Sequence, residues 1–274
     1  MKKYNLLRIC AVLAVSSVFL TGCSMNLINN TYYTYENADK YTAGDREITE
    51  TIDSINIDYV SGDVRLIGSD TDEVTITETA NKELDDEQMV HTWVDGSTLY
   101  VRFCASSKSI DLNNIEKELE IVVPESQLLD TLLVEISSGS FYCSDITSGD
   151  INVSSSSGAI EVNGSADNIN LEASSGSVYL NQERESENIS INTSSGSITA
   201  EIIATDKLDI DASSGDVTVY LPEDADVTAN VETSSGEFNY ELSFSRIDGA
   251  YVSGDGSSVM NINTSSGDVS LLAR

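Results

Sequence analysis

The sequence is poor in proline, tryptophan, histidine and basic residues. Its 274 residues include two prolines, one tryptophan and one histidine, and 14 Lys+Arg stand against 46 Asp+Glu, which gives a formal net charge of −32. Such a surface repels nucleic acid and anionic lipid and attracts cations and basic peptides, although solubility alone is another reason for it. We therefore expect no nucleic-acid partner.

A single histidine leaves few ways to build a catalytic site. His91 would be the one base available to a Ser-His-Asp set, and it lies beside Met89, Val90 and Trp93, where a packed or surface position is the simpler interpretation. The sequence has no C-x-x-C or H-E-x-x-H spacing. We predict a protein that is not an enzyme, with no catalytic residue, no cofactor and no metal site.

The N-terminal apolar run is too short for a membrane-spanning helix. Residues 1–23 read MKKYNLLRICAVLAVSSVFLTGC, in which a basic start precedes an apolar run over residues 9–20. The end of this run, Leu-Thr-Gly-Cys, resembles the bacterial lipoprotein signal. That resemblance implies cleavage after residue 22, a diacylglycerol on Cys23, and an extracytoplasmic protein that is lipid-anchored to the bacterial cell membrane. The alternative is an ordinary secretory signal followed by a chance cysteine.

Cleavage would make the chain still more acidic and would leave few cysteines. Residues 1–22 hold three of the 14 basic residues and no acidic residue, so the mature chain has 11 basic against 46 acidic residues and a formal charge of −35. With Cys10 removed and Cys23 lipidated, Cys104 and Cys143 remain. They could form one disulfide in an exported protein, but strand alternation predicts that Cys143 is a buried thiol and that Cys104 faces a different environment.

A Ser-Ser-Gly phrase recurs through the second half of the chain. Its glycines are spaced by 19, 18, 20, 19, 21 and 31 residues, the last interval holding an insertion around residues 248–257. A period of 19 to 20 residues is typical of a solenoid with one coil per repeat. The related VSGDV places one more such glycine near the start, and the expected corners are Gly62, Gly139, Gly158, Gly176, Gly196, Gly215, Gly236 and Gly267.

Apolar residues keep a fixed position relative to each of these glycines. They stand seven and five residues before the glycine and two and four residues after it, for example Ile169, Leu171, Val178 and Leu180 around Gly176. Steps of two are strand periodicity with one buried face. Each Ser-Ser-Gly is then a corner between two strands, where glycine fits because there is no room for a Cβ or because φ is positive. The serines would hydrogen-bond backbone groups that the bend leaves unpaired.

These patterns predict an all-β, single-domain β-solenoid, a β-helix-like stack of coils with Ser-Ser-Gly corners. We expect a signal peptide at residues 1–22, a lipidated N-terminus and flexible tether at 23–46, and the solenoid at 47–274. Within it, residues 47–135 are less regular, with hairpin excursions, and residues 136–274 form the regular repeats. Residues 111–119 are the one weak helical candidate, and the tyrosines of the tether could instead contact the wall or membrane surface.

The chain resembles the bacterial putative-adhesin family of unknown function, also called the toastrack domain. The likeness covers residues 47–274 and is carried by VSGDV, IVVPESQLLDTLLVEISSGS, VTVYLPEDADVTANVETSSGEFN and the final NTSSGDVSL. It implies a β-solenoid-like stack on the cell surface, often linked to envelope-stress systems. It supplies no catalytic or binding residue to transfer.

The function that follows is binding, shielding or spacing. Acidic residues follow a Ser-Gly at Asp63, Asp150, Asp216 and Asp268, and Glu237 would lie one coil from Asp216, so loose divalent-cation binding is one prospect. The main hypothesis is a surface interaction module, either adhesive or sensing envelope stress. Its partners would be the membrane through the lipid, and an envelope component, a cationic peptide or a surface protein. The alternative is a purely structural or shielding lipoprotein without a specific ligand.

Overall fold

The structure is a computed structural model that describes residues 31–110 and 114–274. The predicted signal peptide, with its lipoprotein-like Leu-Thr-Gly-Cys end at Cys23, lies outside the described residues. No helix in the described part of the chain is long and apolar enough to cross a bilayer.

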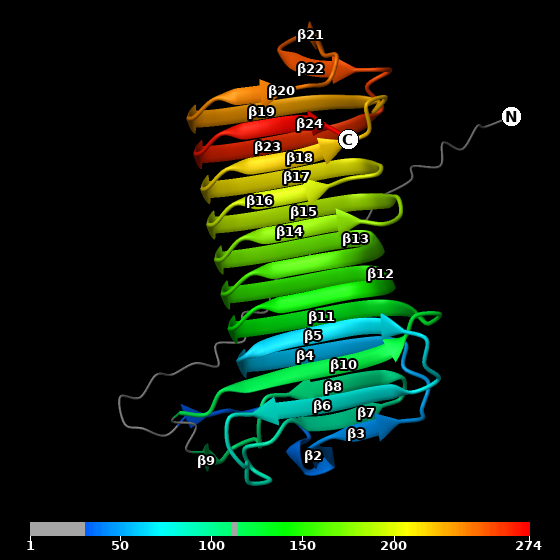
Figure 1. The fold of residues 1–274 in the computed structure, drawn as a ribbon, viewed down its shortest axis with the longest axis vertical. Helices are drawn as coiled ribbons and strands as arrows, with labels where there is room; N and C mark the ends of the chain where they lie inside the picture. The colour runs from blue at the N-terminus through cyan, green and yellow to red at the C-terminus, as the bar shows by residue number, and fades with distance from the viewer. Residues whose placement is uncertain (1–30, 111–113) are drawn as a thin grey trace, which may run out of the picture.

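Two rows of parallel strands form the body of a tall stack of coils (Figure 1). One row holds the strands that precede the glycine corners, with β8 added at one end. Its spatial order is β8 (Thr98–Arg102), β4 (Ser54–Ser61), β11 (Leu128–Ser138), β12 (Phe141–Ser157), β13 (Ile160–Ser175), β15 (Ser186–Ser195), β17 (Thr205–Ser214), β23 (Ser258–Ser266) and β19 (Val227–Ser235). The other row holds the strands that follow the glycine corners, with β10 added at one end. Its order is β10 (Lys117–Pro124), β5 (Asp63–Ser69), the first parts of β12 and β13, β14 (Val178–Gln182), β16 (Ile198–Glu201), β18 (Val217–Leu221), β24 (Val269–Ala273) and β20 (Phe238–Tyr240).

Antiparallel strands close both ends of this stack. At the end nearer residue 31 they are β2 (Thr42–Ala43), β3 (Arg46–Ile48), β6 (Val74–Ala80) and β7 (His91–Asp95), and at the other end they are β21 (Ser245–Ile247) and β22 (Ala250–Ser253). A separate pair joins β1 (Thr31–Tyr32) to β9 (Ser109–Ile110), and the single helical turn among the described residues is the 3-10 helix η1 (Ala38–Lys40). An open strand edge invites pairing with another chain, so these strands protect the ends.

The hydrophobic core lies between the two rows, in the register that the sequence predicts. Around Gly176, for example, Ile169, Leu171, Val178 and Leu180 are all buried. The exception is the coil of β19 and β20, where Phe238 is half-buried and Tyr240 is 47% exposed. The all-β solenoid is therefore confirmed. Phe238 and Tyr240 are more exposed than their equivalents because their coil lies at the end of the stack, with no further coil of the described chain packed on it.

The coils do not stack in chain order at either end. The last coil of the chain, β23 and β24, lies between the coil of β17 and β18 and the coil of β19 and β20. At the other end β8 and β10, which come later in the chain, cover the first coil of β4 and β5. The expectation that Glu237 lies one coil from Asp216 is therefore wrong, because Asp268 lies between them.

Two local predictions also need correction. The expected tether does not extend to residue 46, since the Tyr33 hydroxyl donates to the Asp58 carbonyl, Tyr35 donates to the Cys104 carbonyl, and β2 pairs with β7. The weak helical candidate is wrong where the structure describes its end, because β10 begins at Lys117. Glutamates alternate with apolar residues over residues 118–121, which favours a strand with one buried face.

Candidate binding surfaces

The eight predicted corner glycines form a column in which each backbone closely approaches the next. An ideal Cβ on Gly158 would lie 1.9 Å from the carbonyl oxygen of Gly139, and seven of the eight glycines approach a corner glycine of the neighbouring coil in this way, at 1.9–2.1 Å. For Gly62 the carbonyl at 1.9 Å is that of Lys117. Six of them also have positive φ, whereas Gly176 and Gly236 do not. The close approach, more than the backbone conformation, is thus the shared reason for glycine at these corners.

The hydroxyls that bind the corner backbone are not those of the Ser-Ser-Gly phrase. Some come from the residue three positions before the glycine, as when Thr193 donates to the Gly176 carbonyl at 3.3 Å and Thr233 donates to the Gly267 carbonyl at 3.1 Å. Others come from the residue directly after the glycine, as when the Ser177 hydroxyl accepts the N–H of Ser197 at 3.3 Å. Ser194 and Ser195 are exposed, and the backbone of the phrase bonds from coil to coil, with Gly176 N–H donating to the Ser195 carbonyl at 2.9 Å. The paired serines therefore leave a row of hydroxyls on the surface.

Acidic residues directly after the glycine cap the amide of the next coil. The Asp216 carboxylate accepts the N–H of Asp268 at 2.9 Å, the Asp268 carboxylate accepts that of Glu237 at 2.8 Å, and Asp63 does the same for Ser140 at 2.8 Å. Asp150 is not at a corner but inside β12, where it accepts from the Asn168 amide. These contacts give the acids a structural role, and no cluster of three or more metal-ligating side chains occurs among the described residues.

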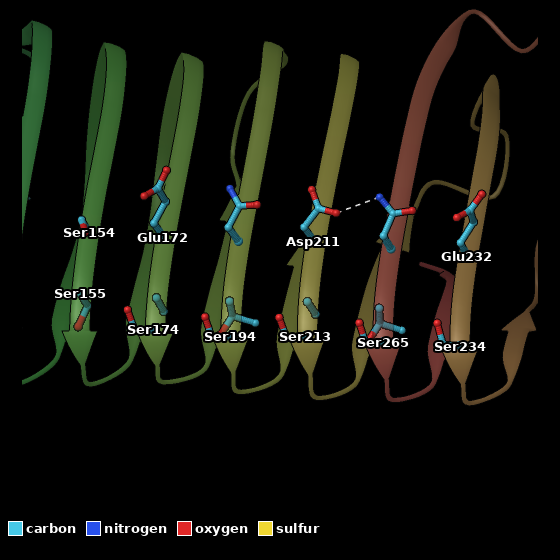
Figure 2. A pocket seen from close by; sticks show the side chains of 16 residues that line it. Ser154, Ser155, Glu172, Ser174, Ser194, Asp211, Ser213, Glu232, Ser234 and Ser265 are labelled. Atoms are coloured by element: carbon cyan, nitrogen blue, oxygen red, sulfur yellow. Dashed lines mark hydrogen bonds between the residues drawn. The ribbon is translucent and has the colours of Figure 1, made fainter. Parts of the chain in front are cut away.

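A shallow groove of about 580 Å³ runs along the stack over the strands that precede the corners. Figure 2 shows its two walls, one of exposed serines such as Ser174, Ser194 and Ser213, and one of acidic and amide side chains. Small side chains that are almost fully buried form its floor, for example Ala173 and Thr193.

Acidic and amide residues alternate along the second wall. Strand pairing places Glu172, Asn192, Asp211, Asn263 and Glu232 side by side in that order. The Asn263 amide donates to Asp211 at 2.9 Å, as the dashed line in Figure 2 shows. With strands about 4.8 Å apart, like charges two strands apart are separated by about 10 Å. Each amide thus keeps two carboxylates apart, and none of the three acids pairs with a lysine or arginine in the part of the chain that the structure describes.

A buried ion pair ties the irregular end of the stack together. Lys117 Nζ lies 2.7 Å from Glu78, and their side chains are 0% and 3% exposed. Lys117 also donates to the carbonyls of Gln88 and Phe103, while Glu78 accepts from the Tyr59 hydroxyl and from Val90 N–H. Burial lowers the pKa of Lys117, and the Glu78 carboxylate opposes that shift. Since neither side chain reaches solvent, we interpret the pair as structural.

The two cysteines and the histidine considered in the sequence analysis do not form a common site. Cys143 and Cys104 are both buried, free thiols. Burial of Cys143 agrees with its register, whereas the expectation that Cys104 faces a different environment fails because β8 ends at Arg102 and alternation stops there. Burial raises the pKa of both thiols, for Cys104 to about 11. His91 is partly exposed on β7, with Nδ1 2.9 Å from the Met89 carbonyl.

Aromatic clusters at both ends were not found from the sequence. Tyr41 packs between Tyr35 and Trp93 near the start of the described chain. At the far end, Tyr251 of β22 packs against Phe238, Tyr240 and Phe244. Aromatic residues scattered between strands follow no period, so the repeat register could not place them.

Several solved structures are similar to this chain. A putative cell adhesion protein from Clostridium sporogenes is 16% identical, with a TM-score of 0.39, over 85% of this chain and 100% of that one. A putative adhesin from Bacteroides fragilis is 13% identical, with a TM-score of 0.42, over 84% and 96%. A putative lipid binding protein from Parabacteroides distasonis is 19% identical, with a TM-score of 0.45, over 85% and 97%.

The family assignment rests on the sequence. No curated protein matches the chain. The family model described as Toastrack DUF4097 matches residues 52–201 and again residues 168–272, so the two matches together span both the irregular and the regular coils. The chain belongs to the Toastrack DUF4097 family.

Proposed function

We propose that this protein is a non-catalytic interaction module on the bacterial cell surface, held to the membrane by a lipid on Cys23, and that it binds cationic amphipathic peptides. The observation that carries the proposal is the groove wall on which Glu172, Asp211 and Glu232 recur at every second strand without a basic partner among the described residues. A formal net charge of −32 for the whole chain adds long-range attraction for basic ligands.

The spacing of the carboxylates along the groove favours an extended basic ligand over a compact ion. Carboxylates about 10 Å apart lie beyond the screening length of about 8 Å at physiological ionic strength, so they act as separate contacts. A chain with several lysines can meet them one after another, and each contact is weak alone. A purely structural or shielding role is the alternative, and a binding titration distinguishes the two.

The test is a titration of the mature chain carrying Cys23→Ser with a basic amphipathic peptide. We expect binding at low salt and a marked loss of affinity when the salt approaches the physiological concentration. A groove variant with three neutral replacements, Glu172→Gln, Asp211→Asn and Glu232→Gln, should bind more weakly than the wild type at low salt.

A matched control separates the groove from total charge. Glu118→Gln, Glu120→Gln and Glu125→Gln remove the same charge from exposed positions near the other end of the stack. If this control weakens binding as much as the groove variant does, the groove is not the site. If the wild type binds no basic peptide even at low salt, the structural or shielding role replaces the proposal.

A further inference from the structure

A second hollow of about 370 Å³ lies on the side of the stack opposite the glycine corners, where the chain turns from one coil to the next. Its floor is apolar and consists of side chains that are at most 2% exposed, namely Ile202, Leu221, Val227 and Met260. Ile203, which also lines the hollow, is 37% exposed. The volume is within the range of pockets that hold small ligands or side chains of a partner.

The hollow exists because the last coil is inserted out of chain order. After Leu221 the chain crosses over the coil of β23 and β24 before β19 begins at Val227. The Asp226 carbonyl accepts the N–H of Ser258, and the Leu221 carbonyl accepts that of Arg274, so the crossing segment is fixed at both ends. Between these anchor points the crossing segment spans two coils and leaves the space open.

Four carboxylates surround the opening of this apolar floor. They are exposed and take part in no ion pair among the described residues: Glu185, Asp206, Asp224 and Asp226. Lys207, the neighbour of Asp206, is already paired with Asp209. Asp226 also accepts the N–H of Asp255 at 2.8 Å, so it is the most firmly held of the four.

One polar atom in the wall of the hollow lacks a partner in the described part of the chain. The Ser258 hydroxyl oxygen is buried and makes no hydrogen bond there. A buried hydroxyl without a partner destabilises this wall of the hollow, but its oxygen has no area exposed to a ligand.

We propose that this hollow binds an apolar side chain of a cationic peptide while the peptide's lysine or arginine residues pair with the surrounding carboxylates. The inference rests on the proposed function and adds to it a shaped site with an apolar contact. An apolar floor ringed by carboxylates complements a ligand that has both apolar and basic groups. Such a site fits neither an anion nor a purely polar cation. Because an apolar contact is not screened by salt, binding in the hollow should persist at physiological ionic strength.

The experiment uses two peptides of equal length and equal lysine content, one with leucines and one with serines between the lysines. With the mature Cys23→Ser chain at physiological salt, we expect the leucine peptide to bind and the serine peptide to bind at least about tenfold more weakly, the difference expected for burying one leucine. Asp206→Asn with Asp224→Asn should weaken the binding of the leucine peptide, because its lysines lose their partners in the hollow. Separately, Ala225→Arg should fill the hollow and remove the preference for leucine. Ile203→Ser, at an exposed position, should reduce it with little effect on folding.

The control is again charge-matched, with Glu118→Gln and Glu120→Gln at the other end of the stack. If the hollow variants bind the leucine peptide as this control does, or if both peptides lose affinity equally with salt, the hollow is not the site although the low-salt binding of the proposed function still stands. If neither peptide binds at low salt, both proposals are wrong. Melting temperatures of all variants identify any loss that comes from unfolding.

Discussion

Gly196 and Ser195 are neighbours at one corner, yet they should differ greatly in their tolerance of substitution. Gly196 has φ of 151°, and a Cβ on it would lie 2.1 Å from the carbonyl oxygen of Gly176 in the adjacent coil. Ser195 is exposed, and its contribution to the stack is its backbone carbonyl, which accepts from Gly176 N–H. We expect Gly196→Val to destabilise the protein strongly and Ser195→Ala to change it little.

The size of the effect follows from the contacts that must move. Real Cβ contacts lie at 3.0 Å or more, so the two coils have to separate by roughly 1 Å at this corner. A strained φ costs about 1–3 kcal/mol. The separation also weakens the two backbone hydrogen bonds that join these coils at the corner, from Gly176 N–H to the Ser195 carbonyl and from Val178 N–H to the Ser197 carbonyl, at about 1 kcal/mol each. A total of about 3–5 kcal/mol corresponds to a fall in melting temperature of about 10 °C in a protein of this size.

Thermal unfolding followed by circular dichroism measures this difference. Ser195→Ala should stay within about 0.5 kcal/mol of the wild type, as for most surface changes. Gly176→Ala separates the two causes, because Gly176 lacks positive φ but a Cβ there would lie 1.9 Å from the Gly158 carbonyl oxygen. Equal melting temperatures for Gly196→Val and Ser195→Ala would refute the idea that close backbone approach and positive φ require glycine at the corners.

Two further predictions concern the ends of the molecule. Lys117→Met should cost about 3–5 kcal/mol in denaturant unfolding because it leaves Glu78 buried without its partner, and adding Glu78→Gln should recover most of that loss; a double variant no more stable than the single one would contradict this. Cys23→Ala should release the protein from the membrane fraction or leave the precursor uncleaved, and normal processing with unchanged membrane retention would show that Cys23 is not the lipidated residue.

The local conformation could be predicted from the sequence because it depends on residues close together in the chain. Ile189 and Ile191 before Gly196, and Ile198 and Ala200 after it, alternate on both sides of a glycine, and all four are buried in the structure. Burial of one face of each strand requires that alternation. The register of each coil, and the position of Cys143 inside it, follow from the same rule.

The order of the coils could not be predicted in the same way. Every regular coil presents the same pattern of apolar and polar positions to its neighbours, so coil β23–β24 fits on β17–β18 as well as β19–β20 would. The interval of 31 residues before Gly267 indicated an insertion, but not that its two flanking coils exchange places. The contacts of Tyr35 and Tyr41 could not be predicted for a related reason. They join segments that are far apart in the chain and that do not belong to any repeat.

This exchange of coils produces both candidate surfaces. In chain order Asp211 would be followed on the groove wall by Glu232, and two carboxylates on adjacent strands about 5 Å apart would repel each other. With β23 between them, Asn263 donates to Asp211 and the acids alternate with amides. The same insertion stretches the segment after Leu221 across two coils and opens the apolar hollow there. The two surfaces on which the proposed binding of basic peptides rests thus arise from long-range topology, whereas the repeat itself supplies only the scaffold.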